Sequence, residues 1–322
     1  MGVLPTHRRQ GLLTKLMRKQ LEDAHARGEP IASLFASEGA IYGRFGYGVA
    51  ALKGEIDLPK AHARLVDEEP PAPASLLENE DEALEVLPPI YDRAREETVG
   101  MLSRTADWWR VRRFGGGPAH GGGEQNRVVL ELDGETAAYA LYSLNFESER
   151  FISKTVLDVR EAIGATPAAL RAIWRYLLSI DWVERIRADF LPLDHPLFFL
   201  LDEVRRMDFT VAESLWIRLV DVGAALSARS YAADEAVVLE IADEFCPWND
   251  GRWRLAQGGC ERSDADPDLR LTVNELGSVY LGGVAFDQLA RAGRIKEIAE
   301  GAVARADALF RTPRQPWCPE LF

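Results

Sequence analysis

The sequence has few cysteines, no long hydrophobic run and fewer basic than acidic residues, and each shortage excludes a class of protein. The three cysteines among its 322 residues, Cys246, Cys260 and Cys318, are odd in number and show no CxxC spacing. Neither a disulfide framework nor a zinc site is therefore predicted. No apolar run approaches the roughly 18 to 20 residues of a membrane-spanning helix, and charge precedes any apolar stretch at the N-terminus, unlike in a signal peptide. We expect a cytoplasmic protein without a membrane partner.

The charge balance excludes further classes of partner. The 38 Lys and Arg residues are outnumbered by 51 Asp and Glu residues, which gives a formal net charge of −13. This balance argues against nucleic acid as a partner and fits cationic small molecules better, although surface acidity usually serves solubility. No metal site is predicted, because metal-ligand spacing is absent among His7, His25, His62, His120 and His195.

Strand and helix patterns alternate along the chain, which predicts a mixed α/β (α+β) protein. We expect three domains, at residues 1–58, 59–222 and 223–322. The acidic, proline-bearing segment at 66–75 is predicted to be an exposed connection, and GGGPAHGGGEQ at 115–125 a flexible loop between elements.

Local signals place several elements within these domains. A helix over LLTKLMRKQLEDAHARG is predicted to end at Gly28, where left-handed geometry is needed. Asp133-Gly134 is typical of a hairpin turn, and Thr166-Pro167 of a helix start. LWIRLVDV at 215–222 is expected to be the strand that closes the second domain. VVLEIAD and DLRLTVNELG in the third domain are both typical of strands.

The strongest local motif is VLPTHRRQGLL, in which a basic, glycine-bearing turn directly precedes the first helix. Such a turn allows backbone N–H groups to approach an anion, and the helix N-terminus adds positive potential. Arg8 and Arg9 supply further positive charge. Taken alone, an RxxG string is more typical of a basic helix cap on a solvated face than of an anion site.

The second motif is ASEGAIYGRFGYG, which follows one strand after that helix. A tyrosine at such a place can protonate a departing thiolate, because its pKa of about 10 is close enough to that of a thiol. Taken alone, Tyr42, Phe45 and Tyr47 are more typical of core aromatics packed between glycine turns than of a proton donor.

Several strings in order resemble one family, the Eis-type (enhanced intracellular survival) GNAT N-acetyltransferases of actinobacteria. The strings are PTHRRQGLL, ASEGAIYGRFGYG, LWIRLVDV, FCPWNDGRWRL, YLGG and DALFRTPRQPWCPELF, and together they extend over nearly the whole chain. The resemblance implies an acetyl-CoA-binding GNAT domain, a second GNAT-like domain and a C-terminal domain similar to sterol carrier proteins. It also implies acetyl-CoA as the acyl donor and a cytoplasmic homo-oligomer, a hexamer.

The same resemblance assigns roles to individual residues. Tyr42 would be the general acid, and the free carboxylate of Phe322 the general base. The acetyl-CoA site would be formed by Val3, Arg8, Arg9, Gln10, Gly11, Leu12, Leu13, Ser37 and Glu38. Leu13 departs from the family pattern, which has Gly or Ala in that position. Relatives also carry the first half of the GNAT domain before the segment that matches VLPTHRR, so residues 1–58 would hold its C-terminal half.

We therefore expect an acetyl-CoA-dependent N-acetyltransferase that acts on primary amines of a small polycation similar to an aminoglycoside, a polyamine or lysine. The motifs contain no Ser-His or Cys-His pair, which favours direct transfer without a covalent enzyme intermediate. One alternative is a lipid- or ligand-binding protein that uses the C-terminal domain beside a decayed catalytic domain. Another is an inactive truncated paralogue that only assembles with partners.

Overall fold

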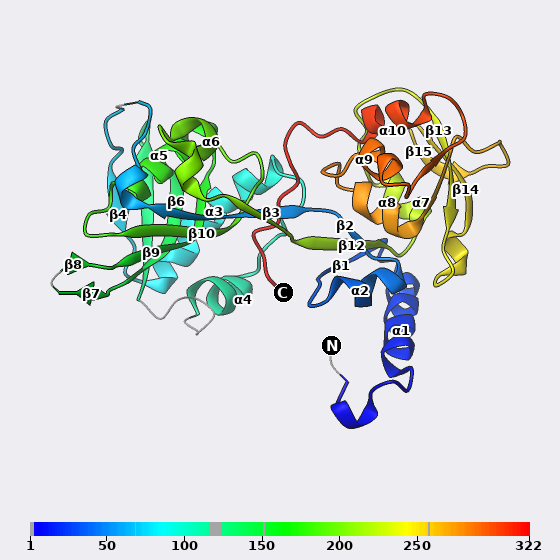
Figure 1. Ribbon diagram of the computed structural model, residues 1–322, viewed down its shortest axis with the longest axis horizontal. Helices are drawn as coiled ribbons and strands as arrows, with labels where there is room; N and C mark the ends of the chain where they lie inside the picture. Colours follow the sequence, from blue (N-terminus) through cyan, green and yellow to red (C-terminus); the bar gives the residue numbers. More distant parts are fainter. Residues whose placement is uncertain (1–2, 68, 116–123, 151, 257) are drawn as a thin grey trace. The chain divides into compact units, whose positions relative to one another are not determined.

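The computed structural model describes residues 3–67, 69–115, 124–150, 152–256 and 258–322, and confirms a mixed α/β protein (Figure 1). His120 and most of the predicted GGGPAHGGGEQ loop lie outside the described residues. The chain divides into two compact units. Unit 1 comprises Met1–Leu52, Glu213–Pro316 and Leu321–Phe322, and unit 2 comprises Lys53–Ala212 and Trp317–Glu320.

Unit 1 is built from the two ends of the chain. Its helices are η1 (Pro5–His7), α1 (Leu12–Ala26), α2 (Gly39–Tyr42), η2 (Gly43–Phe45), α7 (Val222–Ser227), η7 (Pro247–Asn249), α8 (Val273–Val279), α9 (Phe286–Arg291) and α10 (Ala302–Phe310). Its strands are β1 (Ile31–Phe35), β2 (Gly48–Val49), β12 (Leu215–Leu219), β13 (Val237–Ala242), β14 (Gly251–Ala256), β15 (Gly259–Arg262), β16 (Leu269–Thr272) and β17 (Lys296–Glu297).

Unit 2 comes mainly from the middle of the chain. Its helices are η3 (Lys60–His62), α3 (Glu80–Glu96), α4 (Ala106–Trp108), the π-helical η4 (Trp109–Phe114), α5 (Pro167–Ser179), α6 (Leu197–Leu200) and η6 (Val204–Met207). Its strands are β3 (Leu52–Pro59), β4 (Ala74–Leu76), β5 (Gln125–Leu132), β6 (Glu135–Asn145), β7 (Ser148–Glu149), β8 (Ile152–Ser153), β9 (Val156–Gly164), β10 (Arg185–Leu191) and β11 (Thr210–Glu213).

The first sheet of unit 1 joins segments that are far apart in the sequence. Its strand order is β1-β12-β2, and β12 is antiparallel to both neighbours. The sequence correctly predicts a strand at β12. This strand pairs with β1 and β2, which belong to the predicted first domain, and not with strands of the second domain, which it was expected to close. A strand flanked on both sides has a nearly continuous apolar sequence, which does not indicate its partners.

The second sheet of unit 1 has the order β15-β14-β13-β16-β17. β13 is a strand as predicted, but DLRLTVNELG is a strand only as far as Thr272, and α8 begins at the next residue. The change occurs at a capping box. The Thr272 side chain accepts a hydrogen bond from the backbone N–H of Asn274, and the Glu275 carboxylate accepts one from the backbone N–H of Thr272.

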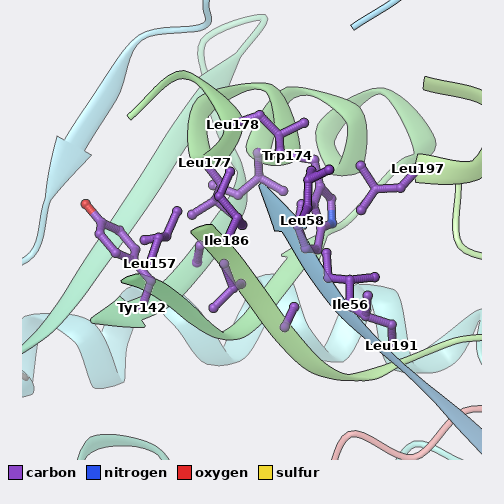
Figure 2. Close-up of a cluster of buried hydrophobic side chains, with 14 of the residues drawn as sticks. Ile56, Leu58, Tyr142, Leu157, Trp174, Leu177, Leu178, Ile186, Leu191 and Leu197 are labelled. Carbon is purple, nitrogen blue, oxygen red and sulfur yellow. The ribbon is translucent and has the colours of Figure 1, made fainter. Parts of the chain in front are cut away.

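Unit 2 is a seven-stranded sheet, ordered β11-β3-β10-β9-β6-β5-β4, with one main helix on each face. On one face, Trp174 and Leu177 of α5 pack against Leu157 and Ile186 of the sheet (Figure 2). On the other face, α3 packs against the opposite side of β6. β9 and β10 are parallel, and α5 connects them. The predicted hairpin turn between β5 and β6 and the predicted start of α5 are both confirmed.

A β-bulge in β9 places charged side chains in the interior of unit 2. Leu141 and Tyr142 of β6 pair with Glu161 and Val159, so Arg160 is an extra residue in β9. Val159 belongs to the apolar cluster beneath α5, whereas Ile163 belongs to the cluster beneath α3. Because a bulge reverses the side-chain alternation, Glu161 points to the α3 face rather than to the α5 face.

Candidate active site

The turn before α1 has the features of an anion site. Arg8, Arg9, Gln10 and Gly11 are all exposed. Gly11 is the N-cap residue at φ 72°, and no side chain caps this end of the helix. The first N–H groups of α1 have no acceptor within the helix. In the described part of the chain, Arg8 and Arg9 form no ion pair. Two free guanidinium groups therefore lie beside uncapped backbone donors, an arrangement suited to a phosphate or pyrophosphate group.

The corresponding strand-to-helix turn of unit 2 lacks these features. The Thr166 hydroxyl accepts a hydrogen bond from the backbone N–H of Ala169 at 3.1 Å, and Pro167 has no N–H to donate. No RxxG pattern precedes this helix. Of the two turns, only the one before α1 thus presents backbone N–H donors that no side chain caps, beside arginines that form no ion pair with a described residue.

Apolar packing connects α1 to the second sequence motif. Met17 of α1, Phe45 and Tyr47 form one buried cluster. Leu13, near the start of α1, and Tyr42, at the end of α2, pack against the same cluster. This contact holds the ASEGAIYGRFGYG segment in a defined position relative to the N-terminal turn of the helix.

Tyr42 and Tyr47 lie close together in very different surroundings. Their ring centroids are 6.2 Å apart, with an angle of 76° between the ring planes. Tyr47 is 1% exposed, and burial raises the pKa of its hydroxyl to about 12. Its carbonyl oxygen accepts a hydrogen bond from the Asn274 side chain at 3.0 Å, which ties it to α8. Tyr42 is only partly buried, so its ring is the more accessible of the two.

Phe322 lies at the end of β1. Its ring packs edge-on against Phe35, the last residue of that strand, with centroids 5.4 Å apart. Ser37 and Glu38 follow Phe35 and are exposed, and α2 then leads to Tyr42. The structure thus brings Phe322 to the strand end from which the Tyr42 segment begins.

The remaining predicted site residues belong to the first turn of the chain. Val3 is partly buried and lies in no strand, and Met1 and Gly2 lie outside the described residues. Leu12 and Leu13 are the first two residues of α1 and are partly buried. Gln10 is exposed beside Gly11, between the arginines and the helix.

No cluster of three or more His, Cys, Asp or Glu side chains in the described part of the chain has a geometry that would hold a metal ion. Burial raises the pKa of the Cys260 and Cys318 thiols to about 12 and lowers the pKa of His195 to about 3. None of the described helices is long and apolar enough to cross a membrane.

Two buried ion-pair clusters were missed by the sequence analysis. In unit 1, the guanidinium of Arg218 and the carboxylate of Asp243 pair at 2.6 Å with both side chains almost fully buried. In unit 2, Arg104, Arg113, Glu161 and Glu320 form a second cluster. The available signal was an isolated charge within an apolar strand, such as the arginine of LWIRLVDV. The partners of these residues are far away in the sequence and left no comparable signal.

Comparisons with known protein families agree with this architecture. Acetyltransferase (GNAT) domain families match residues 1–50 and residues 100–219. A sterol carrier protein domain family matches residues 222–319. The two GNAT matches therefore include the turn before α1 and the α5 turn of unit 2.

Individual relatives are similar over almost the whole chain. An uncharacterized N-acetyltransferase of Streptomyces avermitilis is 39% identical over 335 residues, covering 100% of this chain and 80% of that protein. N-acetyltransferase Eis of Mycobacterium tuberculosis is 33% identical over 321 residues, covering 96% of this chain and 76% of that protein.

Solved structures show the same similarity. Eis1 from Mycobacterium abscessus has a TM-score of 0.88 at 35% identity, covering 100% of this chain and 81% of that chain. A GCN5-related N-acetyltransferase from Anabaena variabilis has a TM-score of 0.83 at 20% identity, covering 100% and 80%, a likeness of fold alone.

Proposed function

Because this chain belongs to the Eis-type family of GNAT N-acetyltransferases, we propose that it transfers the acetyl group of acetyl-CoA directly to a primary amine of a small polycation. The family defines the enzyme class, an N-acetyltransferase, and GNAT enzymes use acetyl-CoA as the acyl donor. The acceptor class, direct transfer and the site residues are our proposals. A polycation similar to a polyamine, an aminoglycoside or lysine suits a protein with a net charge of −13.

The observation that carries the proposal is the open turn before α1. A pyrophosphate needs several N–H donors and positive charge, and the turn offers uncapped backbone donors beside Arg8 and Arg9. Gly11 has no neighbour within 4 Å of where a Cβ would lie, so the space above the turn is open. The residues present thus fit the diphosphate part of acetyl-CoA, with Val3, Ser37 and Glu38 proposed to line the rest of its site.

Direct transfer needs one proton acceptor and one proton donor from the chain. We assign the acceptor to the carboxylate of Phe322, which takes the proton of the attacking ammonium group, through a water if needed. The amine nitrogen then bonds to the thioester carbonyl carbon and releases its second proton to solvent, and it becomes the amide nitrogen as the bond from that carbon to sulfur breaks. Tyr42 donates its hydroxyl proton to the departing sulfur and regains a proton from solvent. Tyr42 suits this role better than Tyr47, because deep burial keeps the Tyr47 hydroxyl from the reacting groups.

The test is a double variant of the turn, Arg8→Ala with Arg9→Ala. Each lost charge-assisted contact to phosphate should weaken acetyl-CoA binding by on the order of 1.5–3 kcal/mol. The matched control, Lys19→Ala with Arg27→Ala, removes the same charge from the middle of α1 and from the residue after its end, and should bind normally. Both variants should retain the parent circular dichroism spectrum. Unchanged affinity of the Arg8/Arg9 variant in calorimetry would refute this assignment.

A ligand-binding role for residues 222–319 is the alternative, suggested by their match to a sterol carrier protein domain. A cavity of about 350 Å³ in this region is lined by Arg252, Arg262, Ser263 and Asp264. Four polar side chains are a poor lining for a fatty chain, so the cavity does not favour a lipid. Displacement of a fluorescent fatty acid by natural lipids, together with no acetyl transfer, would favour this alternative instead.

We further propose that the enzyme works in the cytoplasm as a homo-oligomer, a hexamer by family resemblance. Its partners would be small molecules rather than nucleic acids or membranes, consistent with its net charge of −13. Sedimentation equilibrium would measure the mass of the assembly, and a monomer at micromolar concentration would refute the oligomer.

A further inference from the structure

Residues 43–47, directly after Tyr42, form a closed turn in unit 1. The N–H of Gly46 donates to the carbonyl oxygen of Gly43 at 3.2 Å, and the N–H of Tyr47 donates to that of Tyr42 at 3.4 Å. Gly46 has a φ of 85°, a conformation that glycine adopts without strain and that allows the chain to reverse here. Contacts that fix this turn therefore also fix the place from which the Tyr42 side chain extends.

One side chain from outside the turn is bonded to both of its ends. Nδ2 of Asn274, at the start of α8, donates to the carbonyl oxygen of Gly43 at 2.6 Å and to that of Tyr47 at 3.0 Å. Carbonyl oxygens only accept hydrogen bonds, so the amide nitrogen and not the amide oxygen must face the turn. Asn274 lies 231 residues after Gly43, within the region matched by a sterol carrier protein domain family.

The end of α8 that carries Asn274 is itself held firmly. The N–H of Asn274 donates to the Thr272 hydroxyl at 3.3 Å, and the Glu275 carboxylate accepts from the N–H of Thr272 at 2.9 Å. Nε of Arg294 also donates to the Glu275 carboxylate, at 2.8 Å, and Glu275 is buried. A side chain whose supports are fixed can hold its own partners in a fixed geometry. The amide of Asn274 is therefore presented to the turn from a fixed support.

The same region also backs the turn with apolar packing. Phe45, in the middle of the turn, packs edge-on against Phe245, with ring centroids 5.2 Å apart. The Arg18 guanidinium of α1 lies over the Phe245 ring, 4.5 Å from its centroid. Apolar contact is not directional, so it holds the segment in place without setting its orientation. The hydrogen bonds from Asn274 are directional, and they set that orientation.

Tyr42 depends on this orientation more than Tyr47 does. Tyr47 is 1% exposed, so its ring is held by packing on all sides, whereas Tyr42 is only partly buried. A proton donor must come within about 2.6–3.2 Å of the atom that it protonates. A displacement of about 1 Å can lower the rate by about 10². A small tilt of the turn is therefore enough to move the Tyr42 hydroxyl out of range.

We infer that Asn274 is a positioning residue, which fixes the turn after Tyr42 and so keeps the Tyr42 hydroxyl within reach of the departing sulfur. This inference rests on the proposed function, in which Tyr42 is the general acid. Asn274 acts through Tyr42 and the backbone of the turn. The region matched to sterol carrier proteins thereby takes part in acetyl transfer without any bound lipid.

The test compares Asn274→Ala and Asn274→Asp with Ser278→Ala. Both Asn274 variants lack the donor, although aspartate in the first turn favours a helix and alanine does not interact with its dipole. Both should lower kcat about ten- to a hundredfold, part of the ~10² to 10⁴ that a positioned acid supplies. Their KM for acetyl-CoA should stay within about twofold, because the turn before α1 is unchanged.

Ser278→Ala is the matched control. Ser278 lies one turn further along α8 and faces Gly48 of β2, where a Cβ would lie 2.5 Å from its hydroxyl oxygen. This variant should keep the kcat of the parent. Kinetics are measured well below the unfolding temperature of each variant. If kcat of the Asn274 variants follows their unfolding temperatures instead of the loss of the donor, Asn274 is only a structural residue and the inference is wrong.

Hydrogen exchange measures the turn directly, without reference to activity. The N–H groups of Gly46 and Tyr47 have their acceptors within the turn, so both should exchange several-fold faster in the Asn274 variants. Exchange in β13 should stay at the parent rate, which shows that unit 1 as a whole has not loosened. Parent-like exchange at Gly46 and Tyr47 would show that the turn does not need Asn274, and would overturn the inference.

A double-variant cycle distinguishes the failure of this inference from that of the proposed function. Adding Asn274→Ala to Tyr42→Phe should have little further effect on kcat, because the donor hydroxyl is already gone. If Tyr42→Phe is as fast as the parent, Tyr42 is not the acid and both ideas are wrong. If Tyr42→Phe is slow but Asn274→Ala is as fast as the parent, or slows both backgrounds by the same factor, the acid stands and the positioning role is wrong.

Discussion

At the scale of single residues, burial separates two neighbouring tyrosines that the sequence alone leaves as rivals. Tyr47 is enclosed by Met17 and Phe45, with the pKa of its hydroxyl raised to about 12, whereas Tyr42 packs at the edge of the same cluster. A donor must reach the departing sulfur, and the partly buried Tyr42 is more accessible for this than the fully buried Tyr47. The family position of Tyr42 and its surroundings therefore point to the same residue.

We expect Tyr42→Phe to lower kcat by about 10² to 10⁴, because it removes the donor hydroxyl and keeps the ring. Acetyl-CoA affinity and the unfolding temperature should hardly change. Tyr47→Phe is the matched control, and its kcat should remain near that of the parent. Steady-state kinetics on both variants measure the difference. A reversed order of effects would assign the acid to Tyr47, and no effect in either would indicate proton transfer from water.

At the scale of elements, α8 depends on close backbone contact with the first sheet of unit 1. A Cβ at Gly277 in α8 would overlap the carbonyl oxygen of Ile217 in β12, and one at Gly48 in β2 would overlap that of Asn274. Backbone atoms cannot move aside as the end of a flexible side chain can. The helix and the sheet therefore lie too close together for any side chain at Gly48 or Gly277.

Gly277→Ala should accordingly lower the free energy of unfolding by about 1–3 kcal/mol, the usual effect of overpacking a closely packed interior. Gly43→Ala is the control, since its nearest neighbour would lie 3.9 Å away and its φ of −54° suits alanine. The control should be neutral or slightly stabilising. Urea denaturation of both variants gives the comparison, and equal stability would contradict the close contact.

Elements that depend on neighbouring residues could be predicted from the sequence, and those that depend on distant ones could not. The helix after Gly11, its end at Gly28, the turn at Asp133-Gly134 and the start of α5 were all predicted correctly. The partners of β12, by contrast, come from residues 31–35 and 48–49, and no local pattern records them. The bulge at Arg160 was also missed, and so were the arginines that hold Glu320. The capping box at Thr272 was a local signal that the alternation of the preceding strand concealed.

At the scale of the whole molecule, a net charge of −13 should increase the rate at which a polycationic substrate associates with the enzyme. A negative surface attracts a multiply charged amine over several ångströms, and salt screens that attraction with a Debye length of about 8–10 Å near physiological ionic strength. We expect kcat/KM for a polyamine to fall several-fold between about 0.05 and 0.5 M salt. A monoamine control should lose much less. Equal salt dependence for the two acceptors would contradict the proposed polycationic substrate class.

The position of β12 between β1 and β2 also bears on how the chain is made. β2 ends at Val49 and β12 begins at Leu215, so a ribosome adding about 5–20 residues per second leaves those first strands without their common neighbour for roughly ten to thirty seconds. Residues 53–212 emerge during that interval and can fold first. Their buried Arg104 and Arg113 then lack Glu320, which is added about 100 residues after Ala212. The unit that can fold earlier therefore receives the carboxylate that neutralises its interior only after the remaining strands of unit 1 have been made.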